Sequence, residues 1–330
     1  MNNRNINIDL IKTISCLGIL GLHCIGYVNY TLYYICTFAV PSFFMVNGFL
    51  MFSKKEITLK YCGFKALSVL KIVVLWNIII SVPMIILKHK FINPLEQIYK
   101  SLIQQGYLWH FWFFGTLIIL YLLLYPLHKL VFSKRFGLSI HIILCVVLFV
   151  LCICNTLYSY ANHYPMCIGV PQSLRLWVSL FYYLLGGLIS RIRTSDIIEK
   201  IPVWVLVVLS FSLSIICNYG QKHLGLYGYS LRAAELFYDE FTVILWIISL
   251  FLLLLKIDIS VKFYAVIESF SKISLGIFIL HPLVLKASEA VFTAKTTPQA
   301  IALWLGITII SALFSKAISK MPYVNKLIEL

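Results

Sequence analysis

The chain has 330 residues, of which 61% are hydrophobic and 12% are charged. An ordinary soluble domain is roughly half apolar and roughly a quarter charged, so this composition excludes a soluble globule and is typical of an integral membrane protein. Lys and Arg outnumber Asp and Glu by 27 to 12, which gives a net charge of +15. No charged residue occurs over 13–53 or 136–174, so the basic residues lie between apolar stretches, which favours membrane orientation over nucleic-acid binding.

Apolar windows long enough to cross a bilayer predict ten transmembrane helices. In chain order they cover residues 8–28, 32–52, 63–87, 108–128, 138–156, 173–190, 201–219, 240–256, 272–290 and 299–317. Short connections join them, without a Ser/Pro-rich linker or a repeat, so we expect a single all-α membrane domain over residues 1–330. The apolar run that follows the polar start has no cleavage-site pattern, which indicates a retained first helix rather than a signal peptide.

The distribution of Lys and Arg predicts how the bundle is oriented. Counted on alternate sides of the expected spans, 17 of them lie on one side and 6 on the other. By the positive-inside rule both termini are cytoplasmic, which requires an even number of spans. The nine cysteines lie mostly in apolar runs and form no C-x-x-C pair, so we expect apolar filler and neither a metal site nor a disulfide framework.

The first expected helix carries Lys12 and His23 on one face. Eleven residues at about 100° each return to within about 20° of the starting direction, and the two side chains stand about 16 Å apart along the axis. Polar groups at such depth need a partner or a water-filled cavity, and an imidazole there can act as a general base. In the alternative interpretation, Lys12 reaches the lipid headgroups and His23 hydrogen-bonds another helix.

Five segments resemble, in order, the motifs of the membrane acyltransferase family 3 proteins. They are IDLIKTISCLGILGLHC, VPSFFMVNGFLM, LWHFWFFGTLIILYLLLYPL, FYYLLGGLIS and SKISLGIFILHPLVL, and together they extend over most of the chain. That family transfers an acyl group, usually acetyl from acetyl-CoA, to hydroxyls of bacterial surface glycans. The resemblance implies that His23 is the catalytic base, that acetyl-CoA is a co-substrate, and that no cofactor is bound permanently.

The sequence departs from the family pattern at several of these positions. Lys12 stands where the family more often has Arg, so a bidentate phosphate contact becomes a point-charge contact. Asn47 replaces the usual Ser before Gly, and Lys65 with Lys71 replaces an Arg-x-x-Arg pair. Phe278 replaces a common Tyr, which indicates that this hydroxyl is not required for the chemistry.

The resemblance and the charge pattern together define the expected site. Because the phosphates of coenzyme A do not enter a bilayer, we expect Lys12, Lys65 and Lys71 to bind the donor at the cytoplasmic side, with headgroup anchoring as the alternative. Residues expected to contact the acceptor or to support the site are Asn47, His110, Trp112, Arg175 and His281.

Each of these supporting residues also has a purely structural interpretation. An aromatic belt at the interface accounts for Trp112 and His110 as well as sugar contact does. Pairing with a nearby acid is favoured for Arg175 over contact with a glycan carboxylate. His281 precedes Pro282, which frees a helix carbonyl, so a structural role is favoured there.

The sequence therefore predicts a multi-pass protein of the bacterial inner membrane that moves an acetyl or other short acyl group from acyl-CoA to a sugar hydroxyl. Its expected partners are acyl-CoA, a cell-surface or lipid-linked glycan and membrane lipids, with no nucleic acid. A transporter or flippase for a glycan or its lipid-linked precursor is the alternative, although the sequence shows no inverted repeat. Two routes across the membrane stay open, namely threading of the pantetheine arm and relay through an acyl-histidine.

Overall fold

The computed structural model describes residues 4–88, 93–193 and 196–329, and over these ranges the chain forms helices and no strand. The α-helices are α1 (Ile6–Cys24), α2 (Tyr30–Ile35), α3 (Ala39–Phe52), α4 (Leu59–Lys88), α5 (Pro94–Leu102), α6 (Trp112–Val131), α7 (Gly137–Ala161), α8 (Leu176–Ile192), α9 (Asp196–Glu199), α10 (Val203–His223), α11 (Phe241–Lys256), α12 (Tyr264–Glu289) and α13 (Thr297–Lys320). Short turns of helix are η1 (Gly26–Val28), η2 (Cys36–Phe38), η3 (Trp109–Phe111), η4 (Met166–Gly169), η5 (Gln172–Leu174), η6 (Leu224–Gly228), η7 (Ala234–Leu236), η8 (Val261–Phe263) and η9 (Val324–Leu327).

Eight helical stretches among the described residues are long and apolar enough to cross a membrane, and each falls on an expected span. The other two expected spans, 173–190 and 240–256, coincide with α8 and α11, which are apolar but have 17 and 16 residues. At about 1.5 Å per residue such helices reach about 25 Å, somewhat less than a hydrocarbon core of about 30 Å. Ten crossings and the cytoplasmic placement of both termini therefore stay predictions.

The second expected span is interrupted rather than continuous. It consists of α2, the turn η2 and α3, which together cover Tyr30–Phe52. Pro41 lies in the first turn of α3, where its missing N–H leaves no intrahelical bond unmade. The interruption lies against α1, since a Cβ on Gly18 would be 2.8 Å from the Cβ of Ala39 and one on Gly21 would be 2.6 Å from the Sγ of Cys36.

The ninth expected span also differs, because α12 begins at Tyr264, before the expected start at 272. The turns before residue 272 carry charged residues, which made this part of the sequence too polar to be predicted as part of the span. Glu268 and Lys272 stand one turn apart and form an ion pair of 2.7 Å between Oε1 and Nζ. An i,i+4 pair of this kind supports a helix end in water, so the helix extends beyond its apolar segment.

Glycines bring α3 and α8 into close contact. A Cβ on Gly48 would lie 1.7 Å from the carbonyl oxygen of Tyr183, and one on Gly186 would lie 2.0 Å from that of Met45. Small residues allow membrane helices to approach in this way, and packing then replaces the hydrophobic effect as the source of association. The glycines of two of the sequence motifs are thus explained by helix packing.

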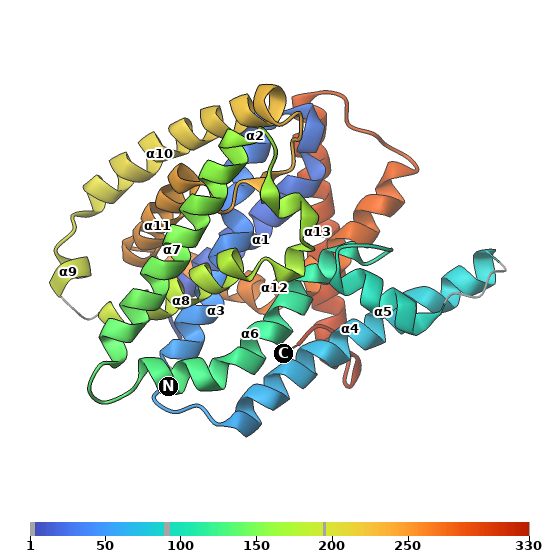
Figure 1. The fold of residues 1–330 in the computed structure, drawn as a ribbon. Coiled ribbons are helices and arrows are strands. Elements are labelled where there is room, and N and C mark those ends of the chain that lie inside the picture. The colour runs from blue at the N-terminus through green and yellow to red at the C-terminus, as the bar shows by residue number, and fades with distance from the viewer. Residues whose placement is uncertain (1–3, 89–92, 194–195, 330) are drawn as a thin grey trace.

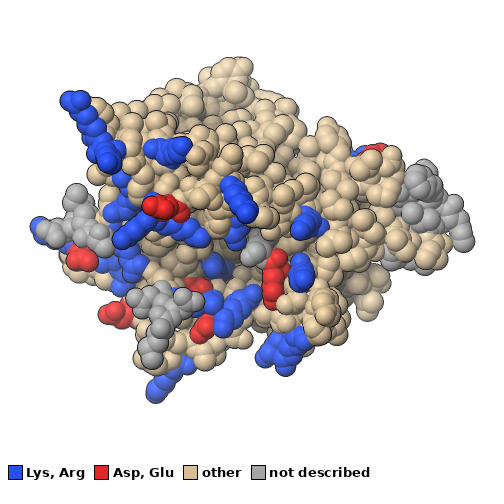
Figure 2. Space-filling model, turned by 90° about the horizontal axis from the view of Figure 1, so that it is seen from below, with Lys and Arg blue, Asp and Glu red and all other residues tan. Residues whose placement is uncertain are grey.

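Helix α1 occupies the centre of the bundle, where it packs against α3, α11, α12 and α13 (Figure 1). Helices α4 and α5 extend from one side of the bundle in the same view. Lys and Arg residues follow or end several helices at the face where α1 begins, including Lys54 after α3, Lys134 after α6 and Lys320 at the end of α13. We call this the basic face, and Figure 2 shows its Lys and Arg side chains gathered around a hollow.

Candidate active site

Two cavities lie along the inward side of α1. The histidine cavity, of about 490 Å³, is lined by His23, Trp109, His110, Gln172 and Glu235 among others, and it lies toward the face opposite the basic face. The lysine cavity, of about 700 Å³, has a lining that includes Lys12, Asn47, Lys65, Tyr121 and Lys272. Both volumes fall within the range of roughly 300–1,000 Å³ that is typical of small-molecule sites.

The two cavities adjoin at three apolar side chains. Ile19 of α1, Phe113 of α6 and Phe278 of α12 line both of them. The ring of Phe278 lies 5.4 Å from that of Phe113, centroid to centroid. We call these three side chains the apolar neck, because they separate a cationic compartment from one that contains imidazoles.

Helix α1 presents its predicted polar face to both compartments. Lys12 lines the lysine cavity, Ile19 lies at the neck, and His23, one turn after Ile19, lines the histidine cavity. The His23 side chain is half-buried. The imidazole therefore faces a hollow inside the bundle, as the spacing of eleven residues predicts.

Three imidazoles converge at the end of α1. The ring of His23 stacks on that of His281 with centroids 5.2 Å apart, and the ring of His110 lies 5.8 Å from that of His281. Trp109 meets His23 edge-on at 4.9 Å. His281 is fully buried, and its Nδ1 lies 3.2 Å from the carbonyl oxygen of Ile277.

Two buried polar side chains that line the histidine cavity lack ordinary hydrogen-bond partners. His110 is 2% exposed and Gln172 is 4% exposed. Neither ring nitrogen of His110 and neither polar atom of the Gln172 side chain has a partner of normal geometry among the described residues. Leaving such groups unpaired costs on the order of 1–3 kcal/mol each, so a small movement of these side chains that let them hydrogen-bond a molecule in the cavity would be favourable.

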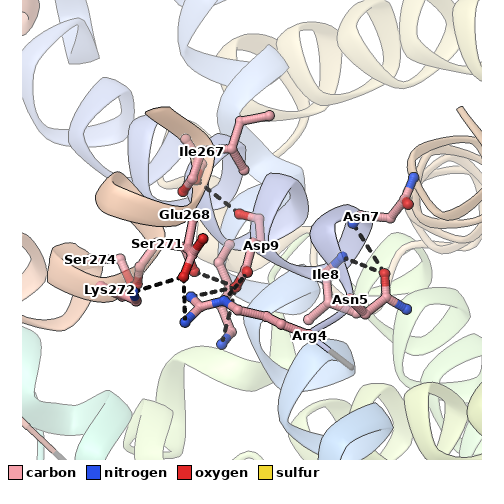
Figure 3. A network of polar contacts seen from close by, with 12 residues as sticks. Arg4, Asn5, Asn7, Ile8, Asp9, Ile267, Glu268, Ser271, Lys272 and Ser274 are labelled. Carbon is pink, nitrogen blue, oxygen red and sulfur yellow. Dashed lines mark hydrogen bonds and ion pairs between the residues drawn. The ribbon is translucent and has the colours of Figure 1, made fainter. Parts of the chain in front are cut away.

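An aspartate that sequence reasoning did not single out organises the start of α1 (Figure 3). Asp9 is buried and accepts hydrogen bonds from Arg4 Nη2 at 3.0 Å and from Ser271 Oγ at 2.7 Å. Its Oδ1 also lies 4.0 Å from Lys12 Nζ. The hydrogen bond to Asp9 raises the pKa of Arg4 above its ordinary value. The signal in the sequence was an acid three residues before Lys12, on the same side of the helix.

The same network connects α1 to α12. Besides the bond from Ser271 to Asp9, Thr13 Oγ1 donates to the carbonyl oxygen of Ile267 at 3.5 Å. Arg4 Nη1 lies 3.8 Å from Glu268 Oε1 (Figure 3). These contacts fix the beginning of α1 against α12 and hold the Lys12 ammonium, whose side chain is 27% exposed, at the wall of the lysine cavity.

The other residues expected to bind the donor divide between two locations. Lys65 of α4 lines the lysine cavity, together with Lys272, which the sequence analysis did not select. Lys71 is exposed on α4 and is absent from the described lining of the cavity. Six helical residues turn the chain by about 600°, so Lys71 points about 120° away from Lys65.

Two of the expected supporting residues, Asn47 and Arg175, make hydrogen bonds inside the bundle. Asn47 lines the lysine cavity, accepts a 2.9 Å hydrogen bond from Tyr121 and donates to the carbonyl oxygen of Phe43. Arg175 is buried and donates to the carbonyl oxygens of Val170 at 3.0 Å and Glu235 at 3.4 Å. The Arg175 guanidinium therefore contacts the backbone of Glu235 and fixes two loops beside the histidine cavity.

Trp112 lines the histidine cavity and is 7% exposed. Its neighbour Trp109, half-buried, is the tryptophan that contacts His23. The sequence analysis selected Trp112 as a supporting residue and did not select Trp109. The short turn η3, which carries Trp109 and His110, directs these two rings toward the cavity.

The fold and site define a membrane-embedded helical bundle with a cationic and an imidazole-lined cavity that adjoin inside it. The sequence model of the acyltransferase domain of acyltransferase family 3 matches residues 5–319, which is nearly the whole chain. The chain belongs to this family. No curated protein and no solved structure matches it.

Proposed function

We propose that this membrane acyltransferase moves an acetyl, or another short acyl group, from acyl-CoA to a hydroxyl of a bacterial cell-surface or lipid-linked glycan, with His23 as the catalytic base. The observation that carries the proposal is the position of His23, which faces a cavity directly beyond the neck that adjoins the lysine cavity. Membership of the acyltransferase family supports the reaction class.

The donor enters from the basic face in this proposal. Lys12, Lys65 and Lys272 give the lysine cavity a positive charge suited to the phosphates of coenzyme A. If the basic face is cytoplasmic, as the positive-inside rule predicts, the cavity opens to the compartment that contains acyl-CoA. The protein then resides in the bacterial inner membrane, with its acceptor reaching the opposite cavity.

The proposed acyl transfer needs one general base, His23, beside the neck. As the acceptor oxygen attacks the thioester carbonyl, an unprotonated His23 nitrogen takes the hydroxyl proton and becomes an imidazolium. The carbon–sulfur bond then breaks, and the leaving thiolate takes up that proton, so that the products are the ester and free coenzyme A. General-base catalysis of this kind contributes roughly a hundred- to ten-thousand-fold in rate.

The apolar neck supports threading of the pantetheine arm as the route of the acyl group. Ile19, Phe113 and Phe278 offer a thioester an apolar passage, and His23 stands one turn beyond Ile19 on the same helix. Direct transfer then needs only the acyl end to pass the neck. A relay through an acyl-histidine is the competing route, and trapping of that species with donor alone would support it.

The test is acyl transfer by the purified chain in lipid nanodiscs, with labelled acetyl-CoA and glycan-bearing membrane extracts as acceptor. We expect His23→Gln to abolish labelled glycan and release of free coenzyme A. The control is His128→Gln, because His128 is a more deeply buried histidine that bonds the Lys54 carbonyl oxygen at 3.0 Å outside both cavities. Movement of glycan without consumption of acetyl-CoA would support the transporter alternative and overturn the proposal.

A further inference from the structure

The two cavities differ in the sign of their charge. Three lysines and one acid, Glu329, line the lysine cavity. The histidine cavity contains Glu235 and Glu289, and no Lys or Arg occurs among the described residues that line it. An anionic molecule is attracted to the first cavity and repelled from the second.

A buried polar side chain without a hydrogen-bond partner among the described residues, Gln172, stands in the wall of the histidine cavity. Gln172 follows Pro171 and begins η5. The backbone oxygen of Gln172 accepts a hydrogen bond from Arg175 N at 3.2 Å. Thr116 Oγ1 donates to the next carbonyl, that of Ser173, at 3.3 Å. The backbone of this turn is thus fixed, while the buried side-chain amide has no partner for its donor or its acceptor among the described residues. A primary amide matches a hydroxyl group or a pair of adjacent hydroxyls, since it donates and accepts at once.

Glu235 supplies a second anchored group on the same cavity. Gln104 Nε2 donates to its two carboxylate oxygens at 3.0 and 3.2 Å, and Arg175 holds its backbone oxygen. Each carboxylate oxygen keeps a further lone pair with which it accepts a hydrogen bond from a hydroxyl. Trp109, half-buried beside His23, adds an aromatic surface on which a sugar ring can pack.

We propose that the histidine cavity binds an uncharged sugar ring through Gln172 and Glu235 and rejects sugars that carry a carboxylate or phosphate beside the reacting hydroxyl. The inference rests on the proposed function, because it names the class of acceptor for that reaction. Binding comes from the hydrogen bonds of the amide and carboxylate. Selectivity comes from Glu235 and Glu289, the charged residues among the described lining of the cavity, whereas the Arg175 guanidinium lies outside that lining, against the backbone of Glu235.

The test compares sugars that differ in one carboxylate. Methyl glucoside with the methyl glycoside of glucuronic acid, and methyl galactoside with the methyl glycoside of galacturonic acid, are titrated against the chain in nanodiscs of uncharged lipid, without acyl donor. Binding is measured by saturation-transfer NMR. We expect at least one neutral sugar to bind and its uronate to bind about tenfold more weakly, with the difference reduced by salt.

Two variants test which residues cause the binding of the neutral sugar and the discrimination against the uronate. Gln172→Leu is expected to weaken binding of the neutral sugar by about fivefold to tenfold, the loss typical of one or two hydrogen bonds. The matched control is Gln221→Leu, because Gln221 is equally buried, accepts from Thr37 at 2.7 Å and lies outside both cavities. The double variant Glu235→Gln with Glu289→Gln is expected to remove the discrimination against the uronate.

The proposal is overturned if the uronates bind as tightly as the neutral sugars, if no neutral sugar binds saturably, or if Gln172→Leu and Gln221→Leu behave alike. Acetyl-CoA turnover is measured separately on the same preparations. Selective sugar binding without turnover would contradict the proposed acyl transfer and leave the selectivity of the cavity standing. Turnover on a uronate acceptor would contradict the selectivity of the cavity and leave the proposed acyl transfer standing.

Discussion

His23 and His281 stack ring on ring, with centroids 5.2 Å apart and planes inclined by 24°. His281 is fully buried, its Nδ1 lies 3.2 Å from the carbonyl oxygen of Ile277, and its Nε2 has no partner among the described residues. The Nδ1 contact fixes the plane of the His281 ring within α12. We therefore predict that His281 is a positioning residue that holds the His23 ring in place beside the neck.

We expect His281→Ala to lower kcat for acyl transfer by about 10- to 100-fold, because a catalytic group displaced by about 1 Å loses that much rate. His281→Phe keeps a flat ring against His23 and should retain most of kcat. The measurement is kcat and KM for acetyl-CoA on both variants, with thermal unfolding to monitor the fold. Equal losses in the two variants would show that stacking does not position His23.

The Asp9 network is expected to act on donor affinity rather than on the chemical step. Asp9→Asn removes the charge that holds Lys12 and Arg4, so KM for acetyl-CoA should rise about threefold to tenfold with little change in kcat, as expected for a partly buried charge contact. Glu96→Gln is the control, because Glu96 pairs with Lys100 on α5 and neither residue lines the lysine cavity. If both variants raise KM equally, the position of Lys12 does not depend on Asp9.

Phe278 is expected to seal the neck. Phe278→Ala should join the two cavities and admit water, so that acetyl-CoA is hydrolysed in the absence of acceptor faster than by the wild-type chain. Because removal of a buried ring costs about 3–5 kcal/mol, thermal unfolding is measured in parallel. Phe278→Tyr keeps the ring and should leave hydrolysis low. Low hydrolysis in a folded Phe278→Ala chain would contradict the sealing role.

Lys65 and Lys71 form a matched pair on one helix. Lys65 lines the lysine cavity and Lys71 is exposed outside it. Lys65→Ala should raise KM for acetyl-CoA by about threefold to tenfold, more strongly at low ionic strength, since salt screens partly exposed charges. Lys71→Ala should leave KM unchanged. The reverse order would mean that the donor approaches along the outer surface of α4.

The sequence was sufficient to locate the helices and the polar face of α1. Apolar windows located every long helix, although α12 begins at Tyr264 rather than at 272 and the second expected span is divided between α2 and α3. A spacing of eleven placed Lys12 and His23 on one side. Periodicity along one helix does not reveal which residues of other helices face the same hollow. The contributions of Phe113 and Gln172 to the cavity walls depend on how α6 and the turn η5 pack against α1, so only the folded chain shows them.

Two features of the site that the sequence analysis did not predict could nevertheless have been derived from helix geometry. Asp9 stands three residues before Lys12, a spacing that brings two helical side chains together. Six residues separate Lys65 from Lys71 and place them on different sides of α4. In both cases the family resemblance directed attention to basic residues, whereas helix geometry alone indicated the acid and separated the two lysines.

The most direct measurement is a structure of the chain with a bound non-hydrolysable acetyl-CoA analogue. The account predicts phosphates beside Lys12 and Lys65, the pantetheine arm in the neck, and the acyl carbon on the His23 side, with room for an acceptor oxygen about 3 Å from both that carbon and an imidazole nitrogen. An acyl group that stays in the lysine cavity, with the neck closed and the His23 ring turned away, would contradict it.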